Sequence, residues 1–207
     1  MPDSLARRWM DGFAADFALE KERLGALDRA AGDGDFAVNL AQALKRAAAG
    51  LQALPETATD AQAWTAAANG FLHTGGTSGP LLGMWLRELA KAWASHDTPL
   101  AALAAGVAAG TAAVQRLGGA QAGDRTMVDA MLPAARALED SLRDGAALAQ
   151  ALERAAGAAG EGARATARMT AALGRASYVG EAAAGIEDPG AAAIALFFRA
   201  GARACAA

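Results

Sequence analysis

Residues 27 to 40 read LDRAAGDGDFAVNL, a stretch in which glycines and three aspartates interrupt a helical pattern. Apolar residues recur at helical spacing before it, as at Phe13 and Phe17, and again after it, as at Phe36 and Leu40. This periodicity predicts amphipathic α-helices, and closely spaced glycines typically interrupt them. We therefore interpret the stretch as a tight junction between two helices.

The same pattern recurs along the chain, where eight helical blocks are separated by breaks rich in glycine or proline. Short connections favour antiparallel neighbours, so we expect an all-α fold, an eight-helix antiparallel up-and-down barrel or bundle in a single domain over residues 1–207. The expected helices run from about Ser4 to Leu27, from Asp35 onward, from Thr59 to His73, from Gly79 onward, from Pro99 to Leu117, from Asp124 to Leu142, from Ala146 to Leu173, and from Pro189 to Cys205 after an N-cap at Asp188.

The composition agrees with closely packed helices. Apolar residues make up 54% of the 207 residues, but alanine supplies much of this share and aromatic residues only 5%. Alanine favours helices, whereas strands are rich in β-branched and aromatic residues. The net charge of -3 and the pI of about 5.4 are unlike the basic surface that binds nucleic-acid phosphates. We expect no nucleic-acid partner.

Three features indicate a cytoplasmic protein. The single cysteine, Cys205, has no intrachain partner, as is common in a reducing compartment. The N-terminus MPDSLARRWMDGF lacks the apolar run of about 7 to 15 residues found in a secretory signal. Residues 98 to 119 are mostly Ala and Gly with a polar Thr or Gln at intervals, which we interpret as a buried helix with too little hydrophobicity to span a bilayer.

The glycine-rich connections are not spread evenly. In an up-and-down bundle the connections after helices one, three, five and seven emerge at one end, and these read AGDGD, TGGTSGP, GGAQAGD and GRASYVGEAAAGIEDPG. Glycines let backbone amides approach an anion closely, and the helix N-termini that follow add positive dipole ends. The sequence therefore predicts one composite site at this rim, with phosphate as its natural ligand.

Three carboxylates in the opening stretch, Asp28, Asp33 and Asp35, repel one another unless a cation neutralises them. Carboxylates are the ligands of hard cations such as Mg²⁺, which also contact phosphate oxygens. One or two Mg²⁺ ions bridging to the phosphates of a nucleotide would explain the cluster, although a capped helix junction with solvated acids would explain it too. An EF-hand fits less well, because DGDFAVNLAQAL lacks the acidic twelfth ligand, and neither a Walker A motif nor G-x-G-x-x-G is present.

Four motifs, LDRAAGDGDFAVNL, GGTSGPLLG, GGAQAGDRTMVDAMLPA and GRASYVGEAAAGIEDPGA, resemble in order and spacing those of the nucleotide-binding L subunit of dihydroxyacetone kinase, the DhaL or DAK2 domain family. The resemblance covers nearly the whole chain and implies an eight-helix barrel with ADP or ATP and two Mg²⁺ ions at one rim. By motif position it implies metal ligands at Asp28, Asp33 and Asp35, and nucleotide contacts at Phe36, Ala37, Val38, Asn39, Thr77, Ser78, Gly118, Met127, Arg175, Asp188, Pro189 and Gly190.

Several of these positions have plainer explanations. Met127 alone would be a core methionine, Ser78 an N-cap, and Arg175 one half of a surface ion pair. The chain also departs from the GDGDHG usual in the family, since Phe36 and Ala37 replace the histidine and glycine. We expect metal binding to survive this change, whereas nucleotide preference and sugar identity are open. The helical spacing favours a core position for Phe36 over one at the rim.

The resemblance implies phosphoryl transfer to dihydroxyacetone or a related short-chain ketose that is held on a separate substrate-binding kinase subunit, which also supplies the acid-base groups. Two donor schemes are open. In one, ATP exchanges freely; in the other, a phosphohistidine protein of the sugar phosphotransferase system rephosphorylates bound ADP. A homodimer is also left open. The alternative is a non-catalytic nucleotide-sensing module that binds a transcription regulator or another protein.

Overall fold

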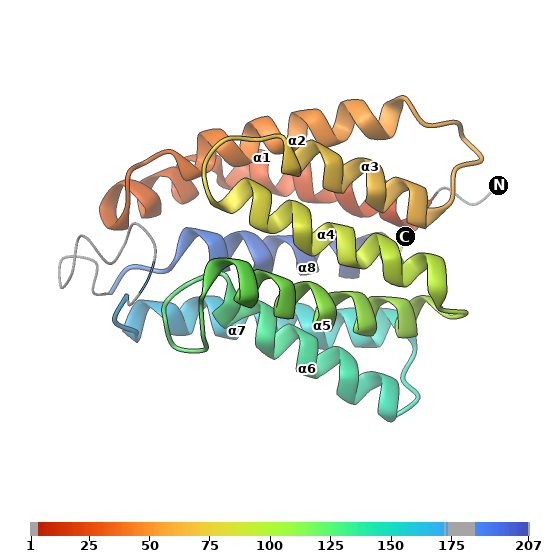
Figure 1. The fold of residues 1–207 in the computed structure, drawn as a ribbon. Coiled ribbons are helices and arrows are strands. Elements are labelled where there is room, and N and C mark those ends of the chain that lie inside the picture. The colour runs from red at the N-terminus through yellow and green to blue at the C-terminus, as the bar shows by residue number, and fades with distance from the viewer. Residues whose placement is uncertain (1–3, 172, 174–184, 207) are drawn as a thin grey trace.

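The computed structural model describes residues 4–171, 173 and 185–206, and within this part it contains eight α-helices, one 3-10 turn and no strand (Figure 1). The all-α prediction is therefore confirmed. The helices are α1 (Leu5–Ala31), α2 (Phe36–Gln52), α3 (Asp60–Leu72), α4 (Ser78–Ser95), α5 (Pro99–Gly118), α6 (Val128–Arg143), α7 (Leu148–Ala165) and α8 (Pro189–Ala206), and the 3-10 turn η1 (Thr166–Arg168) follows α7.

The helices form a closed antiparallel bundle. Each helix packs against the next one in the chain, and α8 packs against both α7 and α1, which closes the ring. The connections after α1, α3 and α5 and the entry to α8 lie at one end, on the left in Figure 1, and the connections after α2, α4 and α6 lie at the other. Three of the glycine-rich connections and the start of α8 therefore share one end, as predicted, while most of the fourth connection lies outside the described residues.

Aromatic side chains fill the centre of the bundle, although they are few. Trp9 of α1 packs edge-on against Trp64 of α3, with ring centroids 5.3 Å apart. Its indole Nε1 donates a hydrogen bond of 2.7 Å to the Phe197 carbonyl of α8. Trp85 of α4 packs edge-on against the Phe197 ring at 4.9 Å. Four helices thus meet at one aromatic cluster, whose buried area dominates this part of the core.

Alanine-rich helix faces surround this cluster, and α5 shows what they do. By length and composition α5 is apolar enough to cross a membrane, so the expectation of too little hydrophobicity was wrong on that point. However, 56% of its most apolar window is buried inside the bundle, and it packs against α4 and α6. Its position as a buried helix is as expected, and its apolar residues contribute to the core.

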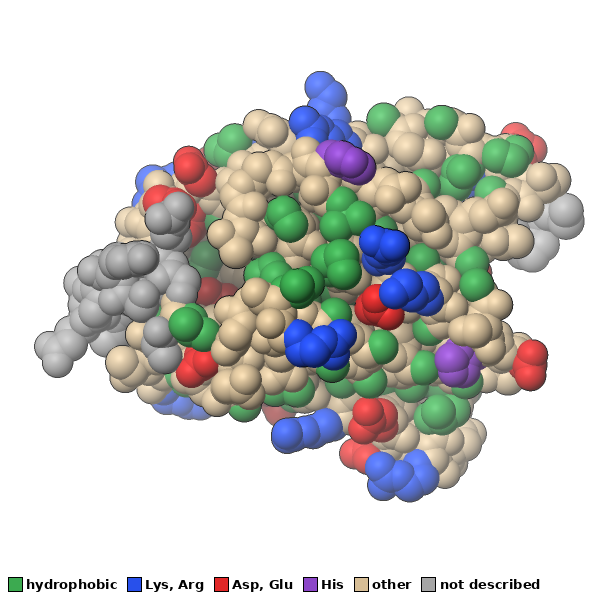
Figure 2. Space-filling view, in the orientation of Figure 1, with side chains coloured by type: hydrophobic (Ala, Val, Ile, Leu, Met, Phe, Trp, Pro, Cys, Tyr) green, Lys and Arg blue, Asp and Glu red, His purple; other side chains and the backbone are tan. Residues whose placement is uncertain are grey.

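Charged side chains lie on the outer faces. Figure 2 shows Lys, Arg, Asp and Glu interspersed over one face of the molecule. Several form pairs within one helix turn, such as Lys91 with Glu88 at 2.5 Å and Arg143 with Asp140 at 2.7 Å. Exposed pairs of this kind contribute only about 0.3–0.5 kcal/mol each. They mark solvated helix faces, and the stability of the fold comes from the core.

Helix ends differ from the predicted ones at three places. The first helix continues past Leu27 to Ala31, so Asp28 lies in its last turn. Helix α6 begins at Val128 instead of Asp124, because the Asp129 carboxylate accepts the amides of Gly123 and Thr126 and folds the preceding residues into a turn.

The third difference is at α7, which ends at Ala165 instead of Leu173. The buried Thr166 hydroxyl donates to the Ala163 carbonyl at 2.5 Å and accepts from the Asp188 amide at 2.8 Å. This side chain thereby joins the end of α7 to the start of α8. In both α6 and α7 the helix boundary is set by hydrogen bonds between a side chain and the backbone, which apolar periodicity does not detect.

Close approach of α2 and α3 depends on Gly70, and this generates a prediction. A Cβ atom added there would lie 2.3 Å from the amide nitrogen and 2.6 Å from the Cα of Ala47. We expect Gly70→Ala to lower the free energy of unfolding by about 2 kcal/mol or more, because two helix backbones must move apart. Chemical denaturation measures the change.

The matched control is Gly157→Ala in α7, where an added Cβ meets nothing within 4 Å. This substitution should stabilise the protein by about 0.5–1 kcal/mol, because alanine loses less conformational entropy in a helix than glycine. Equal effects of the two substitutions would contradict the packing of α2 on α3 described above.

Candidate functional site

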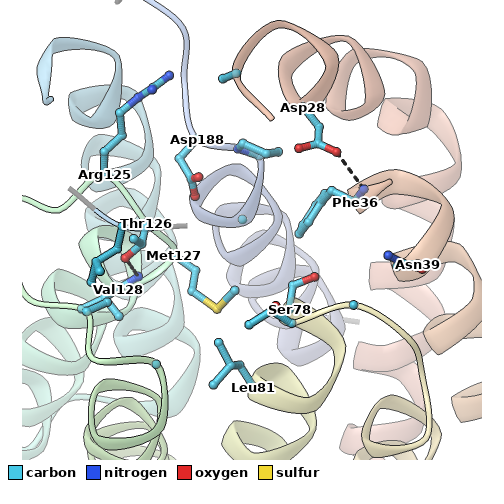
Figure 3. Close-up of a pocket in the computed structure, with 18 of the residues that line it drawn as sticks. Asp28, Phe36, Asn39, Ser78, Leu81, Arg125, Thr126, Met127, Val128 and Asp188 are labelled. Carbon is cyan, nitrogen blue, oxygen red and sulfur yellow. Dashed lines mark hydrogen bonds between the residues drawn. The ribbon is translucent and has the colours of Figure 1, made fainter. Parts of the chain in front are cut away.

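A cavity of about 880 Å³ opens at the glycine-rich end of the bundle (Figure 3). Residues from the connections after α1, α3 and α5, together with the first turn of α8, line it. Its volume lies in the range typical of small-molecule and cofactor sites.

The structure brings most of the sequence-predicted site residues around this cavity. Ala37 does not line it and is buried in α2, whereas Val38 does not line it and is 52% exposed. Arg175 lies outside the described residues. The predicted residues that line the cavity are Asp28, Asp33, Asp35, Phe36, Asn39, Thr77, Ser78, Gly118, Met127, Asp188, Pro189 and Gly190.

The Asp28 carboxylate is fixed in place. One of its oxygens, Oδ2, accepts a hydrogen bond of 2.8 Å from the Phe36 amide, as Figure 3 shows. A Cβ atom at Gly32 would lie 2.4 Å from its other oxygen, so a larger residue there would displace the carboxylate. Burial raises the pKa of Asp28 above its usual range and the nearby Asp33 and Asp35 raise it further, while the amide hydrogen bonds oppose the shift. A cation would relieve this charge accumulation.

The other two carboxylates complete a donor set that suits magnesium. Asp33 and Asp35 are exposed at the mouth of the cavity. Carboxylate oxygens are preferred Mg²⁺ ligands. However, within the described residues no three Asp, Glu, His or Cys side chains are already arranged to hold one ion. The donor chemistry fits Mg²⁺, and exposed side chains turn rapidly between rotamers, so binding would assemble the ligands around the buried Asp28.

The helix N-termini at the two ends of the bundle differ in the hydrogen bonds that their N-cap side chains make. Away from the cavity, side chains cap the first turns of α1, α3 and α5, through Ser4, Thr59 and Thr98, whereas α7 has no side-chain cap. At the cavity, the N-cap residues of α2, α4 and α6 make no such hydrogen bond. These residues are Asp35, Thr77 and Met127, and all three line the cavity.

The first amides of a helix have no partner within the helix, and they carry the positive end of its dipole. At α6 the Val128 amide already donates to the Thr126 hydroxyl, and the Asp129 and Ala130 amides donate to backbone carbonyls. The starts of α2 and α4 therefore present hydrogen-bond donors at the cavity. This arrangement suits an anion with several oxygens, such as a chain of phosphates.

The connection between α3 and α4 lies close to Asn39. Gly76 has a φ of +76°, which a residue with a side chain rarely adopts. A Cβ atom there would also lie 2.7 Å from Nδ2 of the Asn39 side chain. Glycine at this position therefore lets the loop pass over Asn39 and brings Thr77 and Ser78 to the cavity wall.

An apolar wall faces the carboxylates, and most of it was not predicted. Figure 3 shows the Met127 side chain pointing into the cavity above Leu81, with Val128 beside it. The unpredicted lining residues are Ala31, Gly76, Leu81, Val114, Ala120, Arg125, Thr126, Val128 and Leu173. Some signals were available in the sequence: Val114 lies one helical turn before Gly118, and Leu81 lies three residues after Ser78.

Phe36 lies both in the core and at the rim, the two positions between which the sequence left a choice. Its side chain is only 9% exposed and belongs to the core with Leu40 and Leu44, as the spacing predicted. It also lines the cavity directly beside Asp28. A residue at the core surface can therefore shape the site and support the fold at once.

Asp188 begins α8 and closes the upper side of the cavity. Its Oδ1 accepts from the Ala191 amide at 2.7 Å, so it is the N-cap that the sequence predicted. Burial is the main cause that raises the pKa of Asp188 to about 7, and the negative charge of Asp129 adds to it, whereas the Ala191 hydrogen bond and the Arg125 charge oppose it.

The raised pKa makes a prediction about stability. Because folded Asp188 binds its proton more tightly than the unfolded chain does, this group makes the fold less stable as pH rises from about 4 to about 7. Asparagine keeps a capping oxygen and does not titrate. Relative to Asp188→Asn, the wild type should lose about 1–2 kcal/mol of unfolding free energy between pH 5 and pH 8 without metal or nucleotide.

Urea denaturation at the two pH values measures this difference. Asp140→Asn, at an exposed carboxylate near the end of α6, serves as the control and should follow the wild type. Parallel pH dependence in wild type and Asp188→Asn would refute the assignment.

An all-helical fold with a phosphate-suited cavity at one end defines the general class of this protein, and comparison with known proteins gives its family. The family model described as DAK2 domain matches residues 30–203. The chain belongs to the DAK2 domain family.

Relatives of two kinds are found. The ADP-binding subunit DhaL of PEP-dependent dihydroxyacetone kinase 1 from Listeria innocua is 34% identical over 197 residues, covering 94% of this chain and 93% of that protein. The triokinase/FMN cyclase of Rattus norvegicus is 40% identical over 181 residues, which cover 87% of this chain. The chain spans only 31% of the length of the rat protein.

A solved structure supports the fold. The dihydroxyacetone kinase from C. freundii, in complex with AMP-PNP and Mg²⁺, superposes with a TM-score of 0.69 at 27% identity. The similarity covers 94% of this chain and 33% of that one. The resemblance predicted from the four motifs is confirmed at the level of family and fold.

Proposed function

We propose that this chain is the nucleotide-binding subunit of a kinase that phosphorylates dihydroxyacetone or a related short-chain ketose. The observation that carries the proposal is the meeting of the N-termini of α2 and α4, whose N-cap side chains form no cap hydrogen bond, with three carboxylates at one cavity. A phosphate chain with its magnesium ions is complementary to both features. The opposite, apolar wall offers a surface for a nucleotide base.

The residues of the chain divide the work of binding. The amides at the starts of α2 and α4 would donate hydrogen bonds to phosphate oxygens, and Asp28, Asp33 and Asp35 would hold the metal. Bound Mg²⁺ supplies neutralisation of the phosphate charge. Met127, Leu81 and neighbouring aliphatic residues would exclude water from the base. Each of these contributions positions the phosphoryl group for transfer.

The groups that activate the acceptor would come from another subunit. Among the described residues that line the cavity there is no histidine, lysine or cysteine. The L. innocua relative is named as an ADP-binding subunit, and this chain matches 93% of its length. Its name supports a separate substrate-binding partner and the scheme in which bound ADP is rephosphorylated by a phosphohistidine protein. The AMP-PNP and Mg²⁺ of the C. freundii complex support the ligands.

The first experiment tests the metal. Asp33→Asn or Asp35→Asn should weaken Mg-ADP binding at least about tenfold, since the loss of one charged ligand of a hard cation costs upwards of about 1.4 kcal/mol. Isothermal titration calorimetry measures the affinity. Asp97→Asn, at an exposed position near the far end of the bundle, should bind like wild type. Unchanged affinity in both cavity variants would overturn the metal assignment.

The second experiment tests the division of labour. The purified chain with Mg-ATP and dihydroxyacetone should give no phosphorylated product, because the acceptor would be held in position by another subunit. Adding a substrate-binding subunit of dihydroxyacetone kinase should start turnover, with ATP or with a phosphohistidine donor protein. Turnover by the chain alone would contradict the proposal, and nucleotide binding without turnover in any mixture would favour the nucleotide-sensing alternative.

A further inference from the structure

Arg125 is a buried charge for which the binding scheme above gives no role. Its side chain is 2% exposed although it lines the cavity. Its Nη2 donates a hydrogen bond of 2.6 Å to the Ile186 carbonyl, while its Nε is buried without a hydrogen-bond partner in the structure. Burying an incompletely paired guanidinium costs free energy, so a role for this residue is expected.

The backbone of Arg125 is also unusual. Its φ of 61° is the only positive value at a non-glycine residue in the described part of the chain. A residue with a side chain adopts this conformation at a cost unless its surroundings impose it. Here the Asp129 carboxylate holds the amides of Gly123 and Thr126 on either side. The turn thus aims Arg125 at the segment that leads into α8, as Figure 3 shows.

That segment forms part of the cavity wall. A Cβ atom at Gly190 would lie 3.3 Å from the Cβ of Met127 and 3.1 Å from Asp188 Oδ1, so the first turn of α8 rests tightly against the start of α6. The Arg125 charge also attracts the Asp188 carboxylate. Arg125 therefore contacts Ile186 and attracts Asp188 from a position two residues before Met127.

We propose that Arg125 is a positioning residue of the nucleotide cavity, which holds Ile186 and Asp188 so that the first turn of α8 stays packed against Met127. This inference rests on the proposed function for its ligand. A guanidinium suits the role because its planar set of donors can serve a carbonyl and a carboxylate together, whereas an ammonium is a single point charge. Without Arg125, α8 would still pack along its length, but its first turn would be less restrained.

The experiment compares Arg125→Met with wild type by two measurements. Hydrogen exchange without nucleotide should show at least tenfold faster exchange at the Ala191 and Ala192 amides, which bond to Asp188, with no change at the Ala63 amide of α3. Calorimetry should show Mg-ADP affinity reduced at least tenfold. Arg143→Met, at an arginine whose side chain is 75% exposed, is the matched control and should match wild type in both.

Each outcome is decisive. Unchanged exchange at Ala191 and Ala192, equal acceleration throughout the chain, or unchanged Mg-ADP affinity would overturn the role of Arg125. Failure of wild type itself to bind Mg-ADP would instead overturn the proposed function, and the exchange measurement would still test the restraint on α8. If Arg125→Met does not fold, Arg125→Lys takes its place, with at least threefold weaker binding and faster exchange at the same two amides expected; wild-type values in that variant would refute the proposal.

Discussion

The packing of Trp9 of α1 against the backbone of α8 is the contact on which the rest of the structure depends. Its indole donates a hydrogen bond to the Phe197 carbonyl. A Cβ atom added at Gly201 would lie 2.3 Å from the Trp9 ring. Only a residue without a side chain admits the ring so close to the α8 backbone. This contact joins the last helix to the first and closes the bundle. It also fixes the axis along which α8 delivers Asp188, Pro189 and Gly190 to the cavity.

The two ends of the closed bundle serve different purposes. At one end side chains cap the starts of α1, α3 and α5, and Ser4 and the Ala6 amide both bond to the Asp60 carboxylate. At the other end, polar groups are left for a ligand to satisfy. A protein can tolerate unsatisfied amides only where water or a ligand reaches them. The starts of α2 and α4, which no N-cap side chain completes, therefore mark the location of the site.

Much of this was predictable, because the apolar period and the glycine-rich breaks are local properties of the sequence. The eight helices and the shared glycine-rich rim followed from them, whereas most of the individual contact residues were implied by the resemblance of four motifs to a known family. The start of α6 did not, since it depends on the Asp129 carboxylate holding amides that precede it. Arg125 was missed for a similar reason: an arginine in a loop is usually solvated, and only the closed bundle shows that this one is buried against Ile186. Side-chain contacts between distant segments have no periodic signature.

The Thr166 hydroxyl, which joins the end of α7 to the Asp188 amide, has an evolutionary consequence. A second bond, from the Gly185 amide to the Ala167 carbonyl at 2.9 Å, lies beside it. These two hydrogen bonds hold residues 166–167 next to residues 185–188, on either side of residues 168–184. Once its ends are held, a longer connection adds little to the entropy of closing it. Evolution can therefore change the length of this stretch at little cost in stability, while the bundle is inherited unchanged.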